Sequence, residues 1–490
     1  METKILAGLK PKEFFGWFEE ICQHPHGSYH EKPLSDYLYD WAKGQGYEVK
    51  QDKDWNLVID VPATPGMEDR PKVMLQGHID MVCNKVEGST HDFLTDPIQI
   101  YEEDGWITAK GTTLGADNGI AVAAFLAIVS DPSNPHPPLQ LVLTAMEEVA
   151  CVGAVALDPD WLDAKYLINL DVFHDDVFMV SCGGITANRA ELPVKRIPVS
   201  GDVQGIRINI TGLRGGHSGE LIHEGRANAI RVIDEVLFEL KKSFDYGVID
   251  IRGEGVFNAI CAIAGATICV PKADADAALT KVKEIGAVLS KAYIKNEPGL
   301  GVEAAFTDVS PDATVLDGDL VDRLIKLLYV APMGMNTPGD CPVTVADSSS
   351  TFGVLGEEDG VLRLTFSIRS NPEYRQDQVF SKYQILCDLL GAELYQDRRI
   401  VSWEYVPDSK LRDAAVAVYE RLFGEAPRQL TVHFGNEVGT IVGKMIAKDP
   451  TFEAIAFGFE IEDAHAPLER LSIASAQKSY KLLQEILKAI

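Results

Sequence analysis

The sequence predicts an α/β protein, a mixed sheet flanked by helices, into which an α+β domain is inserted. Three observations support this fold class. Residues 1–188 alternate helix-like and strand-like patterns, residues 189–400 change to amphipathic strands with covering helices, and the α/β alternation returns over 401–490. A chain of 490 residues also exceeds what one hydrophobic core usually serves. We therefore expect one domain from residues 1–188 and 401–490 and another from residues 189–400.

The first domain begins with a predicted helix and continues with buried strands. Ser28 to Glu31 has the pattern of a capping box, and an apolar helical face follows it. The strands are nearly continuous apolar runs, which is typical of a sheet covered on both faces. The expected strands lie near 47–51, 56–61 and 72–76 and at Leu139–Ala145 and Tyr166–Leu170, and a buried helix is expected over Ile120–Val129.

In the inserted domain, an amphipathic strand feeds a covering helix twice. Ala266–Val270 precedes a helical pattern over 274–292, and Leu362–Ile368 precedes one over 376–390. The returning segment predicts a helix over Leu411–Leu422, a strand over Phe452–Phe457 and a closing amphipathic helix over Ile473–Ile490.

Bulk composition excludes several classes of partner. The net charge of −28 argues against nucleic acid, whose phosphates require clustered Lys and Arg. No apolar run approaches the length of about 18 residues that a membrane helix needs. The first residues lack the apolar run and cleavage site of a signal peptide. The eight cysteines have no CxxC spacing, which favours reduced thiols and a cytoplasmic location.

Five side chains of metal-ligand type stand in short, distinctive phrases near the ends of predicted strands. Each one alone has an ordinary structural explanation, such as a turn aspartate or a loop histidine. Together, two imidazoles and three carboxylates are a usual set for paired zinc or related divalent ions. The five candidate ligands are His78, Asp117, Glu148, Asp171 and His465.

Two further carboxylates have an expected role beside these ligands. Asp80 lies two residues after His78, so it can accept a hydrogen bond from one ring nitrogen and fix the tautomer of the imidazole. Glu147 and Glu148 face opposite ways in an extended backbone, so one can bind metal while the other faces a bound water. Two divalent cations carry +4 and three carboxylates −3, which leaves a charge that one hydroxide neutralises. Glu147 would take the proton of this water and pass it to a leaving amine.

These phrases resemble the cytosol non-specific dipeptidases, also called aminoacyl-histidine or Xaa-His dipeptidases. The resemblance covers essentially the whole chain, and its motifs include QGHIDMV, KGTTLGADNGI, GLRGGHSG and the final DAHAP. It implies a zinc-exopeptidase-like catalytic domain, with residues 189–400 as an inserted lid. It also implies two Zn²⁺ ions per chain, bridged by Asp117, in a ligand set that would suit Mn²⁺ or Co²⁺ as well. His78 and Asp171 would complete one ion, and Glu148 and His465 the other.

The resemblance extends to residues that would contact substrate. His217, in GGHSG, resembles the histidine that stabilises the tetrahedral oxyanion; without the family it is an ordinary loop histidine. Asn258 and Arg369 resemble lid residues that hold the backbone and carboxylate of the substrate, and an Arg fork suits a carboxylate. Gly435 to Glu437 resembles a substrate-side segment that often has the pattern Gly-x-Glu in relatives, and this assigns Glu437 to the substrate side.

The resulting hypothesis is hydrolysis of dipeptides, Xaa-His and others, by a water that two metal ions activate. One alternative is a related amidohydrolase, such as an aminoacylase or a carboxypeptidase that acts on acylated amino acids. Another is a non-catalytic binding protein on the same scaffold. The expected partner is a small peptide substrate, without nucleic acid or membrane, and the resemblance allows a homodimer.

Overall fold

A computed structural model of the protein describes residues 5–339 and 346–490. The chain forms two compact units. Unit 1 comprises Met1–Cys182, Tyr405–Thr431 and Asn436–Ile490, and unit 2 comprises Gly183–Glu404 and Val432–Gly435. The chain thus leaves unit 1 after Cys182, builds a separate unit, and returns. That unit 2 acts as a lid stays a prediction.

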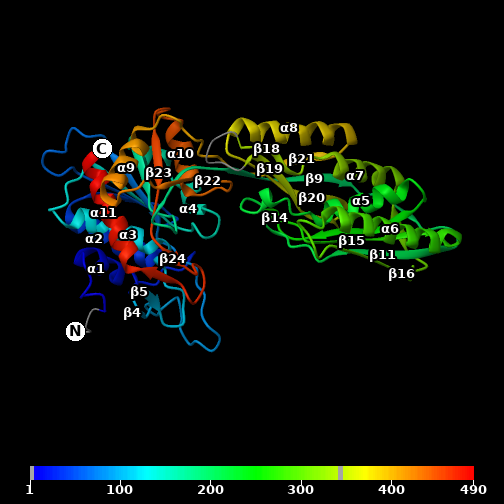
Figure 1. Ribbon diagram of the computed structural model, residues 1–490, viewed down its shortest axis with the longest axis horizontal. Coiled ribbons are helices and arrows are strands. Elements are labelled where there is room, and N and C mark those ends of the chain that lie inside the picture. Colours follow the sequence, from blue (N-terminus) through cyan, green and yellow to red (C-terminus); the bar gives the residue numbers. More distant parts are fainter. Residues whose placement is uncertain (1–4, 340–345) are drawn as a thin grey trace. The chain divides into compact units, whose positions relative to one another are not determined.

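Unit 1 is built on an eight-stranded mixed sheet, which confirms the predicted fold class (Figure 1). β3 pairs in parallel with both β6 and β7, and β7 pairs in parallel with β23, whereas β1 and β2 run antiparallel at one edge. The order is β1 (Glu48–Gln51), β2 (Leu57–Val61), β6 (Leu139–Thr144), β3 (Val73–His78), β7 (Tyr166–Asn169), β23 (Glu453–Ala456), β8 (Val177–Cys182) and β22 (Arg428–Val432).

The central strands are buried along their whole length because helices pack against them. α3 is apolar on all sides and lies against β3, and α1 packs on α3 in turn. This agrees with the buried helix predicted over Ile120–Val129. The helices of unit 1 are α1 (Lys12–Ile21), α2 (Lys32–Gln45), α3 (Ala116–Ser130), α4 (Val152–Ala156), α9 (Lys410–Phe423), α10 (Glu437–Ile446) and α11 (Ile473–Ala489), with a 3₁₀ turn at Pro159–Trp161.

The predicted capping box at Ser28 to Glu31 is wrong. α2 begins at Lys32, its first turn contains a proline, and no side chain caps its first amides. Ser28 instead donates to Asp80 Oδ2 over 2.8 Å, and Glu31 Oε1 accepts from the amides of Tyr29 and Met146. Both side chains therefore serve loops beside the sheet edge rather than the helix.

A second, small sheet of unit 1 joins segments from opposite ends of the sequence. β25 pairs with β5, so the residues after 460 lie beside the residues after 100. This four-stranded sheet has the order β24 (Ile461–Glu462), β25 (Arg470–Ser472), β5 (Trp106–Ala109) and β4 (Ile100–Glu103). The loop between β24 and β25 is thereby held near the residues that precede α3.

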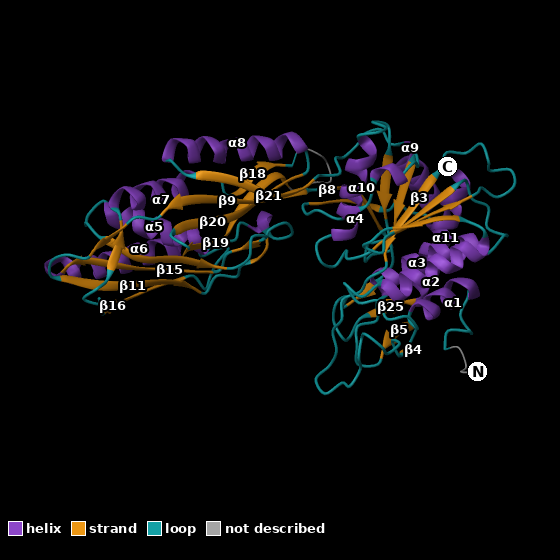
Figure 2. Cartoon of the chain, turned by 180° about the vertical axis from the view of Figure 1, so that it is seen from behind, coloured by secondary structure: helices purple, strands orange, loops and turns teal. Residues whose placement is uncertain are grey.

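Unit 2 is an α+β body with a nine-stranded antiparallel sheet (Figure 2). Buried side chains alternate along β9 and β11, and four long helices cover the apolar face of the sheet. The order is β16 (Gly301–Thr307), β11 (Val203–Thr211), β15 (Ile263–Pro271), β13 (Gly247–Glu254), β19 (Ala346–Glu358), β20 (Val361–Ser370), β9 (Gly184–Pro193) and β21 (Glu393–Ile400), with β18 (Gly334–Pro338) beside β19.

The remaining elements of unit 2 are helices and short strands. α6 follows β15 and α8 follows β20, as the two strand-to-helix patterns predict. The helices are α5 (Ala229–Lys241), α6 (Ala275–Tyr293), α7 (Gly318–Val330) and α8 (Glu373–Leu390), with 3₁₀ turns at Ile222–Glu224 and Lys272–Asp274; β10 (Arg196–Pro198) pairs with β17 (Thr314–Leu316), and β12 (Gly216–His217) with β14 (Ala259–Ile260).

Among the described residues, 5–339 and 346–490, no helix is both long and apolar enough to cross a membrane.

Two helical glycines of unit 1 test how tightly the sheet edge is packed. A Cβ on Gly153 in α4 would lie 2.0 Å from the carbonyl oxygen of Ala145, whereas a Cβ on Gly16 in α1 meets no atom within 4 Å. Gly153→Ala should therefore destabilise unit 1 by about 1–3 kcal/mol. Gly16→Ala should stabilise it by up to about 1 kcal/mol, because alanine loses less backbone freedom on folding. Thermal melting compares the two, and equal melting temperatures would contradict this packing.

Candidate metal centre

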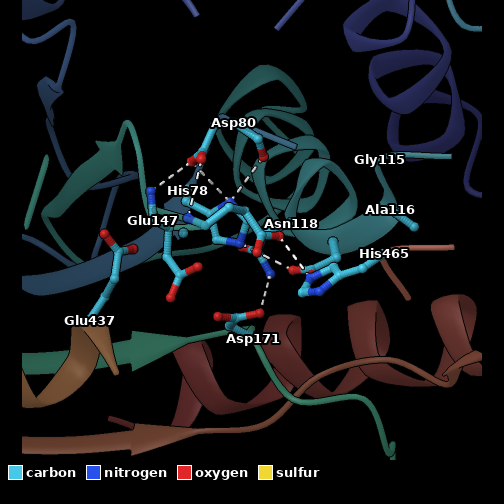
Figure 3. Close-up of polar contacts among 12 residues, drawn as sticks. His78, Asp80, Gly115, Ala116, Asn118, Glu147, Asp171, Glu437 and His465 are labelled. Atoms are coloured by element: carbon cyan, nitrogen blue, oxygen red, sulfur yellow. Dashed lines mark hydrogen bonds and ion pairs between the residues drawn. The ribbon is translucent and has the colours of Figure 1, made fainter. Parts of the chain in front are cut away.

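Three parallel strands of unit 1 end at the same edge of the sheet. His78 is the last residue of β3 and lies opposite Thr144, the last residue of β6. Asn169 ends β7 and pairs with Gln76. The residues that follow these strands therefore meet at one edge, where α/β sheets usually place their ligands. Figure 3 shows His78, Glu147 and Asp171 gathered there.

Asp117 lies between the two candidate histidines. It sits in the first turn of α3, where its backbone is not helical, directly after Ala116 and the left-handed Gly115. His78 Nε2 is 3.1 Å from Asp117 Oδ1, and His465 Nε2 is 2.9 Å from Asp117 Oδ2. Each carboxylate oxygen thus faces a different imidazole, which is the arrangement that a bridging ligand of two cations requires.

The other two candidate ligands, Glu148 and Asp171, lie close to this group. His465 Nε2 is 2.9 Å from Glu148 Oε1, and ligand atoms of His78, Asp117 and Glu148 lie within 4.8 Å of one another. Asp171 is joined to the group through Asn118, whose Nδ2 donates to Asp171 Oδ1 over 3.1 Å. The structure therefore brings the five predicted ligands to one sheet edge, and Figure 3 labels His78, Asp171 and His465 among them.

Asp80 is buried and binds the main chain of the two glutamates as well as His78. Its Oδ1 accepts from the Glu147 amide over 2.9 Å, and its Oδ2 accepts from the Glu148 amide over 3.2 Å. His78 Nδ1 lies 3.0 Å from the carbonyl oxygen of Asp80 and 3.4 Å from Oδ1. Asp80 therefore positions the 147–148 turn in addition to facing the imidazole.

The cluster places several carboxylates close together with little access to solvent, which shifts their pKa values. Burial raises the pKa of Glu147 to about 8; His78 opposes this shift, and Asp171, Glu148 and Asp117 add to it. Burial and Asp117 also raise the pKa of Asp171 well above its usual range. Burial lowers the pKa of His78, but its hydrogen bonds to Asp117 and Asp80 outweigh burial and raise it. The cluster thus stabilises positive charge.

The residues fit divalent metal ions. Both ring nitrogens of His78 face acceptors, Nδ1 the carbonyl oxygen of Asp80 and Nε2 a carboxylate oxygen of Asp117. Such an imidazole needs either a second proton or a cation on the Nε2 side. A neutral imidazole that donates through Nδ1 and ligates through Nε2 satisfies both contacts. Burial raises the pKa values of Glu148 and Asp171 because it disfavours their charged forms. A bound cation would offset this cost, because its positive charge stabilises the ionised carboxylates.

The predicted substrate-contacting residues of unit 2 form a cluster of their own. Arg369 is buried; its Nε donates to Ser218 Oγ over 2.9 Å, and its Nη2 lies 3.3 Å from His217 Nε2. The carbonyl oxygen of Asn258 accepts from Ser218. Within the described ranges, no carboxylate is in ion-pair distance of Arg369. Burial lowers the pKa of Arg369 to about 10, and burial with Arg369 lowers the pKa of His217, so His217 is neutral at neutral pH.

Glu437 lies in unit 1, at the start of α10, and is buried. Its Oε2 accepts from Gln76 Nε2 over 2.7 Å and from Thr144 Oγ1 over 2.6 Å, and Gln76 in turn accepts from Asn169. Burial and Glu147 raise the pKa of Glu437 to about 8. Figure 3 shows its carboxyl group on the same side of the centre as Glu147. A contact of Glu437 with substrate stays a prediction.

Sequence reasoning missed several side chains that hold the ligands in place. The pattern of Ser28 and Glu31 matches a capping box, so it does not indicate their contacts with Asp80 and Met146. Asn118 resembled part of a turn. Glu469 had no signal at all, because a single glutamate four residues after His465 matches no motif. Its carboxylate accepts from the amides of four consecutive residues, Leu114 to Asp117, where α3 begins.

Comparison with known proteins decides the family. The profile of Peptidase family M20/M25/M40 matches residues 74–489. The chain belongs to this family of peptidases. Metal dependence is the norm among M20 peptidases, and the cluster of His78, Asp117 and Glu148 agrees with it.

Three proteins similar to this M20 peptidase match it over nearly their whole lengths. The cytosol non-specific dipeptidase of Escherichia coli (strain K12) is 34% identical over 485 residues, 99% of each chain. The crystal structure of aminoacylhistidine dipeptidase from Vibrio alginolyticus is 31% identical, with a TM-score of 0.92 over 100% of this chain and 98% of that one. The aminopeptidase PepT of Bacillus cereus shares the fold at 15% identity, with a TM-score of 0.58 over 98% and 99% of the two chains.

Removal of divalent cations by a chelator should lower the melting temperature, and the loss should grow with pH. Without a cation, Glu147 has a pKa of about 8 in the folded state against an ordinary value of 4.5. Between these values the folded state binds more protons than the unfolded state, so stability falls as pH rises through that window. A bound cation removes this effect. Melting of chelated and metal-restored protein at about pH 6 and about pH 9 checks it. A loss that is equal at both pH values would contradict the assignment.

Proposed function

We propose that this M20 peptidase hydrolyses unblocked dipeptides with two divalent metal ions. The observation that carries the proposal is the placing of Asp117 between His78 and His465, with Glu148 beside them. The full-length similarity to proteins named as dipeptidases supports dipeptides as the substrate class.

His78 and Asp171 would hold one ion, Glu148 and His465 the other, and Asp117 both. Imidazole and carboxylate ligands suit Zn²⁺, which we propose as the metal, and Mn²⁺ and Co²⁺ are close alternatives. Two such ions would supply Lewis acidity, which would lower the pKa of a water so that it becomes a nucleophile at neutral pH, and would polarise the scissile carbonyl.

Glu147 is the group that would move the proton. It follows a buried strand, its main-chain amide donates to Asp80, and its Oε1 accepts a hydrogen bond from Cys151 Sγ over 3.5 Å. A carboxylate in this position can hold a proton between two steps. It would accept the proton of the attacking water and donate it to the leaving amine.

The Arg369 cluster of unit 2 would bind the carboxylate of the dipeptide. A buried guanidinium without a carboxylate partner among the described residues is costly, and an anionic ligand offsets that cost. The Arg fork also suits a planar carboxylate. His217, neutral beside Arg369, would donate a hydrogen bond to the substrate. The lid role of unit 2, the contribution of Asn258 and a homodimer stay predictions.

Glu147→Gln should retain metal and lose turnover. The substitution keeps the shape and the Asp80 contact to the amide but removes the proton acceptor, which should lower kcat by about 10²–10⁴-fold. Metal content by elemental analysis is the control and should be unchanged. Near-normal turnover with metal present would refute the role of Glu147.

A substrate panel tests the substrate class. Free dipeptides should be hydrolysed and N-acylated amino acids should not, with activity lost on chelation and regained with Zn²⁺. Preference for N-acylated substrates would favour a related amidohydrolase. Absence of hydrolysis by metal-loaded protein would favour a non-catalytic binding role.

A further inference from the structure

Glu469 accepts hydrogen bonds from four consecutive main-chain amides, the last of which belongs to the candidate ligand Asp117. It is 2% exposed. Its Oε2 accepts from the amides of Leu114 and Gly115 over 2.9 and 3.2 Å, and its Oε1 from those of Ala116 and Asp117 over 2.9 and 3.3 Å. Both oxygens are thus used, each by two consecutive amides.

The Leu114–Asp117 segment needs such an acceptor. The first amides of a helix have no partner within the helix, and the backbone of Asp117 departs from helical geometry. Gly115, in the left-handed conformation, turns successive amides toward one side. A buried amide without an acceptor is costly, so the segment would rearrange if the carboxylate were absent.

The same glutamate is tied to the loop that carries His465. The Glu469 amide donates to the carbonyl oxygen of Ala466, and its own carbonyl oxygen accepts from Thr108 Oγ1 over 2.9 Å. At the other end of the loop, Asn84 Nδ2 donates to the carbonyl oxygen of His465 over 2.7 Å. One short loop therefore presents His465 to Asp117 Oδ2 and, four residues later, binds the main chain of Asp117.

We propose that Glu469 is a positioning residue of the metal centre, which sets the main chain of Asp117 and the loop of His465 at the spacing that two cations require. The proposal rests on the metal-binding role of these ligands in the proposed function. Glu469 itself does not contact metal or substrate.

Glu469→Gln tests this directly. The side chain keeps its size, but one oxygen becomes an NH₂ group that faces two amide donors, so two of the four hydrogen bonds are lost. Residues that orient metal ligands typically change metal affinity about 10–100-fold, and we expect a loss of Co²⁺ affinity in that range. The visible absorption spectrum of the bound Co²⁺ should also change, because it reports ligand geometry. Glu462→Gln is the matched control, since Glu462 ends β24 directly before the same loop, is half-exposed, and pairs with Arg470.

The measurement uses full-length chelated protein, titrated with Co²⁺ alone. If Glu469→Gln fails to fold, Glu469→Asp, which keeps the charge one methylene shorter, is titrated instead and should show the same change to a smaller degree. A lower melting temperature with unchanged Co²⁺ affinity and spectrum would mean that Glu469 only stabilises the fold, and would overturn the proposal. Failure of the wild-type protein to bind Co²⁺ would overturn the proposed function instead, so the two failures are distinguishable.

Discussion

Repulsion among buried carboxylates is the constraint on which the rest of unit 1 depends. Asp117, Glu147, Glu148 and Asp171 lie at one sheet edge, where the imidazoles of His78 and His465 partly offset their charge. Burial of such a group costs free energy that well-packed apolar residues would not cost. The arrangement is favourable when the carboxylates share cations, and this explains why the chain retains an acidic cluster inside an otherwise apolar sheet domain.

The candidate ligands are far apart in the sequence, and the fold brings them together in two ways. Parallel pairing of β6, β3 and β7 brings three ligand-bearing loops to one edge, because parallel strands end on the same side. His465, 348 residues from Asp117, cannot arrive by that route. It is delivered by the short strand β25, which pairs with β5 and holds the preceding loop against the start of α3.

The sequence predicts those parts of the structure whose interactions leave a pattern in neighbouring residues. Buried strands such as Leu139–Ala145 and the ligands that follow them combine apolar periodicity with residue types of known chemistry. β24 has two residues and β25 three, so neither has a period to detect. Ser28 and Glu31 matched a helix cap because capping and loop anchoring use the same residue types. The contacts of Glu469 depend on pairing between distant strands, which no local window contains.

The loops that carry the ligands share one device: side-chain oxygens replace the regular partners of their amides. Asp80 accepts from Glu147 and Glu148, Asn169 Oδ1 from the amide of Asp171, and Glu31 from that of Met146, whose backbone is left-handed. Helix or sheet bonding cannot satisfy such irregular backbone, and buried amides require acceptors. Because these acceptors belong to the protein and not to the ligand sphere, the ligand side chains are held in place before any cation binds. Preorganisation of this kind would reduce the ordering cost of metal binding, and it keeps the main chain of Glu147 at a fixed place beside the candidate ligands.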